Sequence, residues 1–369
     1  MADSVTSALQ ILHGNTVFAN SVYQILSKKK GNVFFSPISI HAVLSMAHQG
    51  ARENTAKILS DTLKIPDAKT TAMGYKSILE HLNSIEDVIL LMAYKIYAKK
   101  GQDDETTFIE EFEKSVKENF YADVDFVDFS RKNEAVKKIN GWVEEKTQEK
   151  IRGIVDEELL DEETALLLIN AIYFKGEWLG QFKESDTRNQ TFYMDSENTL
   201  EVRMMKREGK CAYKYDDRLN AEILQLPYKG NNIKMIIILP SERNGIKDLE
   251  LKLASSDINE LADNFATYEV SVSIPKFKME QTMDLDTVMT EIGLKNIFDE
   301  DKANFEGILK LEPNENLCVG KIIQKAYLEV NEKGTEAAAA TGNLSLIPYV
   351  PENIPNLLKI KGPLFENRL

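Results

Sequence analysis

Cysteine and histidine, the side chains that most often bind metals or carry redox chemistry, are scarce in this 369-residue sequence. The two cysteines, Cys211 and Cys318, lie far apart and show neither metal-binding nor redox spacing, so we expect two free thiols. The four histidines all fall in the first quarter of the chain, at His13, His41, His48 and His81. His41 and His48 share one predicted helix, but no third ligand lies near them. The sequence therefore predicts no metal site and no cofactor, and it leaves the cellular compartment open.

Local catalytic motifs are also absent. The sequence contains no Gly-x-Ser-x-Gly, no His-Glu-x-x-His, no phosphate-binding loop and no dinucleotide-binding fingerprint. Carboxylate pairs, such as Asp103 with Asp104 and Glu162 with Glu163, are typical of solvated loops and helix starts. A serine triad assembled from distant residues stays open in principle, because such triads need no local motif. We predict that the protein is not an enzyme.

Excess positive charge and long apolar runs are lacking as well. Lys and Arg number 45 against 59 Asp and Glu, which gives a formal net charge of -14. Such a chain repels polyanions, so the composition argues against nucleic-acid binding. Residues 68–83, predicted to be helical, carry only Lys69 and Lys76 as fixed positive charges, and we expect no strong heparin binding. No run of about 18 apolar residues indicates a membrane span, and the acidic residues 1–4 do not open a secretory signal.

Apolar periodicity predicts a single α+β domain, because helical spacing dominates early, strands dominate later and no linker divides the chain. The expected helices cover residues 5–27, 37–50, 51–82, 108–119, 133–150, 246–261 and 284–293. The expected strands cover residues 33–35, 88–97, 124–129, 165–174, 191–194, 202–205, 212–215, 221–226, 233–239, 270–274 and 322–330. The nearly continuous apolar run at 165–174 is typical of a strand that is covered on both faces.

A stretch of small residues, 332–342, follows the last of these strands and contains four consecutive alanines. One interpretation is a short helix, since alanine is the best helix former and Thr335 could cap the start. The other is a strand, in which Glu336 points to solvent and small side chains share the opposite face. That face consists of Thr335, Ala337, Ala339 and Thr341. A segment of this kind could stand in water as a loop and also slide between existing strands.

Four further blocks precede this stretch in the chain. They are residues 32–40, 170–178, 226–230 and 274–278, which read NVFFSPISI, NAIYFKGEW, LPYKG and IPKFK. Together with the alanine stretch, and in the same order and spacing, they resemble blocks of the serpins, a family of protease inhibitors. The resemblance covers nearly the whole chain and is compatible with an invertebrate member. It implies a single serpin-like domain over residues 1–369, with an N-terminal-rich helix layer, a large central β-sheet, two further sheets and an exposed reactive loop at about 332–356.

The resemblance also implies a mechanism for the alanine stretch. A protease cuts the exposed loop as a suicide substrate, and the freed hinge inserts into the central sheet and traps the acyl-enzyme. The hinge matches Glu332, Gly334, Thr335, Glu336, Ala337, Ala338, Ala339, Ala340 and Thr341. Residues that control strand separation match Ser36, Ser39 and Asn170, with Trp178 where the loop enters the sheet. Ser36 would equally serve as a helix cap, and Trp178 as a core residue.

Two departures from the family pattern stand out. Serpins often carry histidine where Gln324 stands, and glutamine cannot titrate. Residues 361–365 only loosely resemble the proline-phenylalanine turn before the last two strands, and the sequence stops at Leu369. We therefore expect those strands to be shortened or absent, which would leave apolar edges exposed. Family grounds favour an extracellular monomer whose signal has been removed, and a cytoplasmic location stays open.

The small-residue face implies an inhibitor rather than a carrier. The expected partner is a chymotrypsin- or elastase-like serine protease; a papain-like cysteine protease as target and a non-inhibitory serpin are the alternatives. The usual distance from Glu332 puts the cut bond near Pro348. The bond between Tyr349 and Val350 is chemically the most attractive, because an aromatic ring suits a hydrophobic slot. Alternative cuts follow Pro348, Leu344, Ser345 or Leu346.

Overall fold

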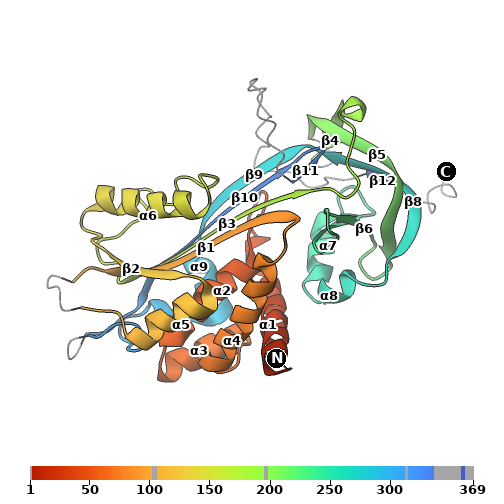
Figure 1. Cartoon of the computed structure of the whole chain (residues 1–369). Helices are drawn as coiled ribbons and strands as arrows, with labels where there is room; N and C mark the ends of the chain where they lie inside the picture. Colours follow the sequence, from red (N-terminus) through yellow and green to blue (C-terminus); the bar gives the residue numbers. More distant parts are fainter. Residues whose placement is uncertain are drawn as a thin grey trace.

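A six-stranded sheet forms the middle of the molecule and carries helices on both faces (Figure 1). The structure, a computed structural model, describes residues 2–101, 106–194, 198–256, 258–311, 315–335 and 359–361. The strand order of this central sheet is β2-β1-β3-β11-β10-β9. Its strands are β1 (Val88–Lys99), β2 (Asp123–Val127), β3 (Leu166–Glu177), β9 (Phe277–Asp284), β10 (Val319–Val330) and β11 (Gly334–Thr335).

The alternation of side chains along β3 explains why helices cover both faces of this sheet. Leu166 and Leu168 pack into the larger core cluster, which includes side chains of helices α1 to α5. Leu167 and Ile169 point the other way and pack against α6. All four are fully buried. A strand that is buried on both faces needs a nearly continuous apolar run, which is the pattern of residues 165–174.

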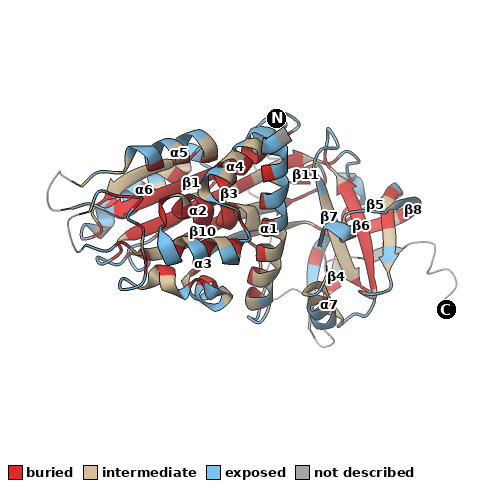
Figure 2. Cartoon of the chain, turned by 90° about the horizontal axis from the view of Figure 1, so that it is seen from below, coloured by how far each residue is buried: buried red, intermediate tan, exposed pale blue. Residues whose placement is uncertain are grey.

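The α-helices of the first half of the chain lie close to their expected positions. The helices of the whole chain are α1 (Ala2–Leu26), α2 (Pro37–Gly50), α3 (Glu53–Leu63), α4 (Ala68–Asn83), α5 (Glu110–Phe120), α6 (Lys132–Lys146), α7 (Ile246–Leu253), α8 (Ile258–Leu261) and α9 (Asp286–Met289), within the described ranges. Seen from below, α2 lies beneath the sheet and is almost wholly buried, whereas α1 and α3 expose one face (Figure 2). The sheet therefore rests on one buried helix that other helices cover.

A second set of six strands has the order β12-β8-β5-β6-β7, with β4 paired to β5. The strands are β4 (Arg188–Tyr193), β5 (Thr199–Asp216), β6 (Ala221–Pro227), β7 (Lys234–Pro240), β8 (Ala266–Pro275) and β12 (Lys359–Lys361). β5 is 18 residues long and includes both strands predicted at 202–205 and 212–215. It pairs with β4 at its start and with β6 at its end. Within the described ranges, the two further sheets expected from the sequence are thus joined through β5.

Residues 33–35 form no strand and are only half-buried, so the prediction of a buried strand there is wrong. Glutamine side chains engage the backbone of this segment instead. The Phe34 N–H donates to Gln281 Oε1, and the Ser36 N–H donates to Gln324 Oε1, at 2.9 Å each. Side-chain acceptors thus satisfy backbone donors that a strand would pair with a neighbouring strand.

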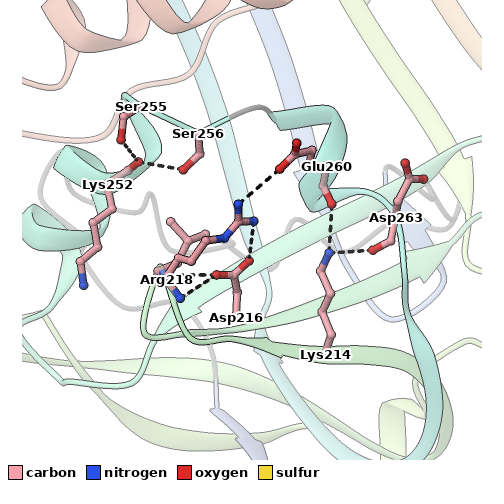
Figure 3. A network of polar contacts seen from close by, with 9 residues as sticks. Lys214, Asp216, Arg218, Lys252, Ser255, Ser256, Glu260 and Asp263 are labelled. Carbon is pink, nitrogen blue, oxygen red and sulfur yellow. Dashed lines mark hydrogen bonds and ion pairs between the residues drawn. The ribbon is translucent and has the colours of Figure 1, made fainter.

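The helix predicted at 246–261 is divided into α7 and α8. Figure 3 shows the hydroxyls of Ser255 and Ser256, which both donate to the Lys252 carbonyl, at 3.0 and 2.8 Å. Serine hydroxyls that bond to nearby carbonyls compete with helix formation. The ammonium group of Lys214 in β5 then donates to the carbonyls of Glu260 and Asp263, at 3.1 and 2.6 Å, and holds α8 against the strands.

The region from 277 to 294 also differs from the prediction. β9, for which no strand is predicted, forms the edge of the central sheet beside β10. The helix predicted at 284–293 keeps regular α geometry only over α9 and continues as a π turn, Thr290–Leu294. Gly293 adopts a φ of 108° in this turn, a conformation that glycine tolerates because it lacks a β-carbon.

Within the described ranges, no helix is long and apolar enough to cross a membrane. No group of three His, Cys, Asp or Glu side chains among these residues could hold a metal ion. Cys211 is buried and Cys318 is half-buried, and both are free thiols.

His41 is fully buried in α2 and is held by two neighbours. One ring nitrogen, Nε2, lies 2.9 Å from the Leu63 carbonyl oxygen, and Nδ1 contacts the Tyr75 hydroxyl. Burial lowers the pKa of His41 to about 4, and the bond to the Leu63 carbonyl only partly offsets this. An unfolded histidine has a pKa of about 6.5. The unfolded chain therefore binds this proton more tightly than the folded chain.

We expect acidification from pH 7 to pH 5 to remove about 2 kcal/mol of stability through His41. The loss begins near the unfolded pKa and is complete below the folded one, because the neutral ring is what the core accommodates. Thermal unfolding of the wild type and of His41→Gln at both pH values measures it, and the variant should lose less. Burial raises the pKa values of Glu222 and Asp286 to about 7 and about 6. Protonation of these two carboxylates adds stability as the pH falls, and it does so equally in the wild type and in His41→Gln. An equal pH dependence of the two proteins would show that His41 does not contribute.

Candidate functional site

The central sheet opens at one end, where the hinge predicted from the sequence begins. β3 and β10 pair directly, in parallel, up to Tyr173 opposite Tyr327. Beyond this point β11 lies between them and runs antiparallel to both. Thr335 lies opposite Val330 of β10 and opposite Gly176 of β3. A chain that continued from Thr335 in the same direction would enter the sheet between β3 and β10.

Thr335 is fully buried in this position. Its hydroxyl oxygen lies 2.6 Å from the hydroxyl of Tyr228, which follows β6. The ring of Tyr228 stacks on Trp178, with ring centroids 4.5 Å apart. Trp178 in turn donates from its indole nitrogen to the Asn331 carbonyl, at 3.0 Å. Two aromatic residues that lie far from the hinge in sequence therefore hold its first residues in the sheet.

Gly334 passes so close to β3 that no other residue fits. A β-carbon at this position would lie 2.0 Å from the carbonyl oxygen of Gly176, well inside van der Waals contact. The turn that brings Gly334 here depends on Asn331, whose side-chain oxygen accepts from the Lys333 N–H at 3.0 Å and from the Gly334 N–H at 3.3 Å. Glycine is required here by close backbone approach as well as by flexibility.

Glu332 is buried and engages two partners with its two carboxylate oxygens. Lys276 forms an ion pair with Oε2 at 2.9 Å, and the Thr187 hydroxyl donates to Oε1 at 2.8 Å. Burial alone would raise the pKa of Glu332, but the bonds from Lys276 and Thr187 hold that pKa below its ordinary value. Glu332 is therefore ionised at neutral pH and ties the start of the hinge to the segment between β8 and β9.

We expect Glu332→Lys to lower stability by about 2 kcal/mol, less than a fully buried pair would lose, because Lys276 keeps about a quarter of its side chain exposed. For a chain of this length that corresponds to a fall of roughly 3 °C in Tm. Thermal unfolding of the wild type and three variants measures the effect. Glu332→Gln should fall less, and adding Lys276→Glu to Glu332→Lys should restore part of the loss. Equal Tm values for Glu332→Lys and the wild type would show that the pair is not stabilising.

The residues matched to strand separation form one connected polar cluster beneath the sheet. The Gln324 side chain, fully buried, donates to Asn170 Oδ1 at 2.6 Å and to the Ser36 carbonyl at 3.1 Å. Asn170 donates to the Ile323 carbonyl at 3.3 Å. The Ser36 hydroxyl donates to Ser39 Oγ at 2.9 Å and makes no side-chain cap bond to α2, although Ser36 is at the cap position. The cluster bridges β3, β10 and the start of α2, and none of its four side chains is ionisable.

The structure thus brings together Ser36, Ser39, Asn170 and Gln324 in one cluster, and Trp178, Glu332, Gly334 and Thr335 in another. Sequence reasoning did not single out Tyr228, Lys276 or Thr187, although the first two lie in the quoted blocks LPYKG and IPKFK. Several predicted residues lie outside the described residues: Glu336, Ala337, Ala338, Ala339, Ala340, Thr341, Leu344, Ser345, Leu346, Pro348, Tyr349 and Val350. The choice between helix and strand for the alanine stretch, and the cut bond, therefore stay predictions.

Comparison with known proteins finds relatives that match along most of the chain. The family model described as "Serpin (serine protease inhibitor)" matches residues 13–360. The human leukocyte elastase inhibitor is 34% identical over 346 residues, covering 91% of this chain and 89% of that protein. Among solved structures, Serpin48 of the insect Tenebrio molitor has a TM-score of 0.82 at 32% identity, covering 96% of this chain and 97% of that one. A cleaved form of Serpin 42Da has a TM-score of 0.82 at 33% identity, covering 89% of this chain and 87% of that one.

Proposed function

Because the chain belongs to the serpin family of serine protease inhibitors, we propose that it acts as a suicide substrate whose hinge inserts between β3 and β10. A target protease cuts the loop that follows Thr335 and remains attached as an acyl-enzyme. The freed hinge continues from β11 as a full strand, carries the protease with it and traps the ester. The observation that supports this most directly is β11 itself, because its two residues already pair with both strands.

The chemistry of the sheet supports insertion along this path. An inserted strand would exchange the direct β3–β10 ladder for two new ladders, and so gain backbone hydrogen bonds worth about 0.5–1.5 kcal/mol each. The residues that follow Thr335 in the sequence carry mostly small side chains, which fit between the helices that cover the two faces of the sheet. A bulky or charged residue at the buried positions would oppose entry. The same features favour an inhibitor over a non-inhibitory member of the family.

The proposed target is a chymotrypsin- or elastase-like serine protease. One relative is named leukocyte elastase inhibitor, and no arginine or lysine lies between Gly342 and Leu358 to serve a trypsin-like enzyme. We place the cut between Tyr349 and Val350, since the aromatic ring suits a hydrophobic pocket. A papain-like cysteine protease that reads an apolar neighbour is the second candidate.

The test is to mix the chain with chymotrypsin, pancreatic elastase, papain and trypsin, and to run denaturing gels. A band at the summed mass that survives boiling with chymotrypsin or elastase supports the proposal, and trypsin serves as the negative control. Cleavage without any adduct would instead indicate a non-inhibitory member. Mass spectrometry of the released peptide locates the cut. An N-terminus at Val350 supports Tyr349, whereas one at Ser345, Leu346, Ile347 or Tyr349 replaces that assignment.

A further inference from the structure

A cavity of about 500 Å³ lies where the starts of β3 and β10 meet α9. Thr164 lines it just before β3, and Val319 and Gly320 line it from β10. The pairing of β3 with β10 shifts its register between Val319 and Lys321, and a β-carbon on Gly320 would lie 2.9 Å from the Thr164 side chain. The volume of this cavity is within the range of small-molecule binding sites.

Negative charge dominates the wall of the cavity. No lysine, arginine or histidine lines it, whereas four carboxylates do: Asp161, Glu163, Asp286 and Glu291. Within the described ranges, Asp161 and Glu291 form no ion pair, and Glu163 pairs with the exposed Lys99 at 3.4 Å. A hollow lined by charge of one sign concentrates ions of the opposite sign, so the cavity attracts cations.

Asp286 shows that the cation already present does not neutralise the wall. Its carboxylate lies 3.3 Å from the Lys321 ammonium group, but that group pairs more closely with Asp284. Burial raises the pKa of Asp286 to about 6, the Asp284 charge adds to this, and the bonds from the Ile322 N–H and from Lys321 only partly offset it. One ammonium group shared by two carboxylates leaves room for a further cation.

Thr164 adds a buried polar group to the same wall. It is 4% exposed, and within the described ranges no side-chain hydrogen bond engages its hydroxyl. A buried hydroxyl without a partner costs free energy, and its oxygen can accept from an ammonium group. Phe298 and Val319 line the cavity with apolar surface. The wall therefore combines separate anionic points with a hydroxyl and an apolar patch.

The spread of the carboxylates decides what kind of cation fits. Among the described residues, no three His, Cys, Asp or Glu side chains come close enough to hold a metal ion together. Separate anionic points instead match a ligand that carries its positive charges at intervals along an apolar chain. The apolar stems of such a ligand can lie on hydrophobic surface while its charges reach the carboxylates.

We propose that this cavity binds a linear aliphatic polyamine. Its ammonium groups bind Asp161, Asp286 and Glu291, and one of them donates to the Thr164 hydroxyl. Its methylene stems cover the apolar patch at Phe298. The site lies away from the hinge and does not depend on the proposed inhibition.

The chain itself offers few cations that could fill the cavity. Residues 102–105, 195–197, 257, 312–314 and 336–358, which lie outside the described ranges, contain no lysine, arginine or histidine. Residues 359–361 pair with β8 in the second set of strands. Arg368 is the one basic side chain that follows them in the sequence, and the test below includes it.

Isothermal titration calorimetry of the full chain at low salt tests the proposal, with spermidine as the probe. The control ligand is spermidine acetylated at both ends, which keeps the carbon chain but carries no charge at its ends. We expect spermidine to bind at one site and at least about tenfold more tightly than this control, the ratio typical of one charge-assisted bond.

Paired variants locate the binding. Asp161→Asn combined with Glu291→Gln should weaken spermidine binding at least about tenfold. The matched control, Glu158→Gln combined with Glu306→Gln, removes two exposed carboxylates that do not line the cavity and should bind like the wild type. Thr164→Val keeps the shape of the side chain and should weaken binding about fivefold through the lost hydroxyl.

Cys318 gives an independent readout, because its half-buried thiol lines the cavity. A cationic methanethiosulfonate reagent forms a disulfide with the thiolate and releases methanesulfinate. It should modify Cys318 at least about tenfold faster than the anionic reagent of similar size, and spermidine should slow it. Mass spectrometry of peptides separates this reaction from that of Cys211.

Several outcomes would overturn the proposal. They are no binding of spermidine, equal affinity for the two ligands, equal losses in the two double variants, or equal rates of the two thiol reagents. Tighter binding of oligolysine than of spermidine would instead indicate a basic segment of another protein. Binding to Arg368→Gln but not to the wild type would show that the chain's own arginine occupies the cavity. Circular dichroism checks that every variant is folded.

Discussion

Replacing Thr335 with arginine is expected to abolish covalent trapping of a target protease and to turn the protein into an ordinary substrate. Thr335 is fully buried between β3 and β10, with its hydroxyl against Tyr228. Because Thr335 already pairs with both strands, an arginine there would be an unpaired charge inside the sheet and would displace β11, from which insertion has to continue. If this raises the barrier to insertion by about 3 kcal/mol, insertion slows roughly a hundredfold. Hydrolysis of the acyl-enzyme is then faster than insertion, and the protease is released in active form.

Thr335→Val is the matched control, because valine has the shape of threonine without its hydroxyl. It should keep the adduct and lose only the bond to Tyr228, which costs about 1 kcal/mol of stability in the intact protein. The measurement is the ratio of boiled adduct to cleaved chain on denaturing gels with chymotrypsin or elastase. An arginine variant that traps protease as well as the wild type would contradict insertion at this position. Circular dichroism of both variants checks that the fold is intact.

Cleavage of the loop without trapping is expected to raise Tm by about 10–15 °C. A strand inserted after β11 would gain roughly ten backbone hydrogen bonds at about 1 kcal/mol each. Dividing that gain by an unfolding entropy of about 2.1 cal/mol/K per residue for this chain length gives the shift. The intact fold is then metastable, and a kinetic barrier keeps the loop out. Thermal unfolding before and after cutting with a metalloprotease, which forms no acyl-enzyme, measures the change.

The Thr335→Arg protein, cut in the same way, is the control for this measurement. It has the same broken loop but should not insert, so its Tm should change little. A large increase in both proteins would show that cleavage stabilises the chain by another route. No increase in the wild type would argue for a family member that does not insert its loop, even if adducts were seen with some proteases.

Much of the secondary structure could be predicted from short-range patterns in the sequence. The apolar run at 165–174 marks a strand that needs cover on both faces, and β3 has that cover. Ser36 followed by proline marks the start of α2, which begins at Pro37. Small residues after a strand predict a hinge from Glu332 onward, and the short strand β11, Gly334–Thr335, lies within that range. Each of these predictions depends on side chains a few positions apart, whose conformational preferences can be recognised from the sequence.

The sequence by itself determined the family and the succession of most helices and strands, because those follow from local periodicity and from ordered blocks, whereas the hinge stays a prediction. Only the tertiary structure decided which groups hold the hinge: Tyr228 lies 107 residues from Thr335, and Thr187 lies 145 residues from Glu332. It also decided that residues 33–35 are no strand, since the side chain of Gln281, 247 residues away, accepts from the Phe34 N–H. A hydrogen bond depends on distance and angle between atoms, and no local pattern records which distant side chain the fold brings within 3 Å.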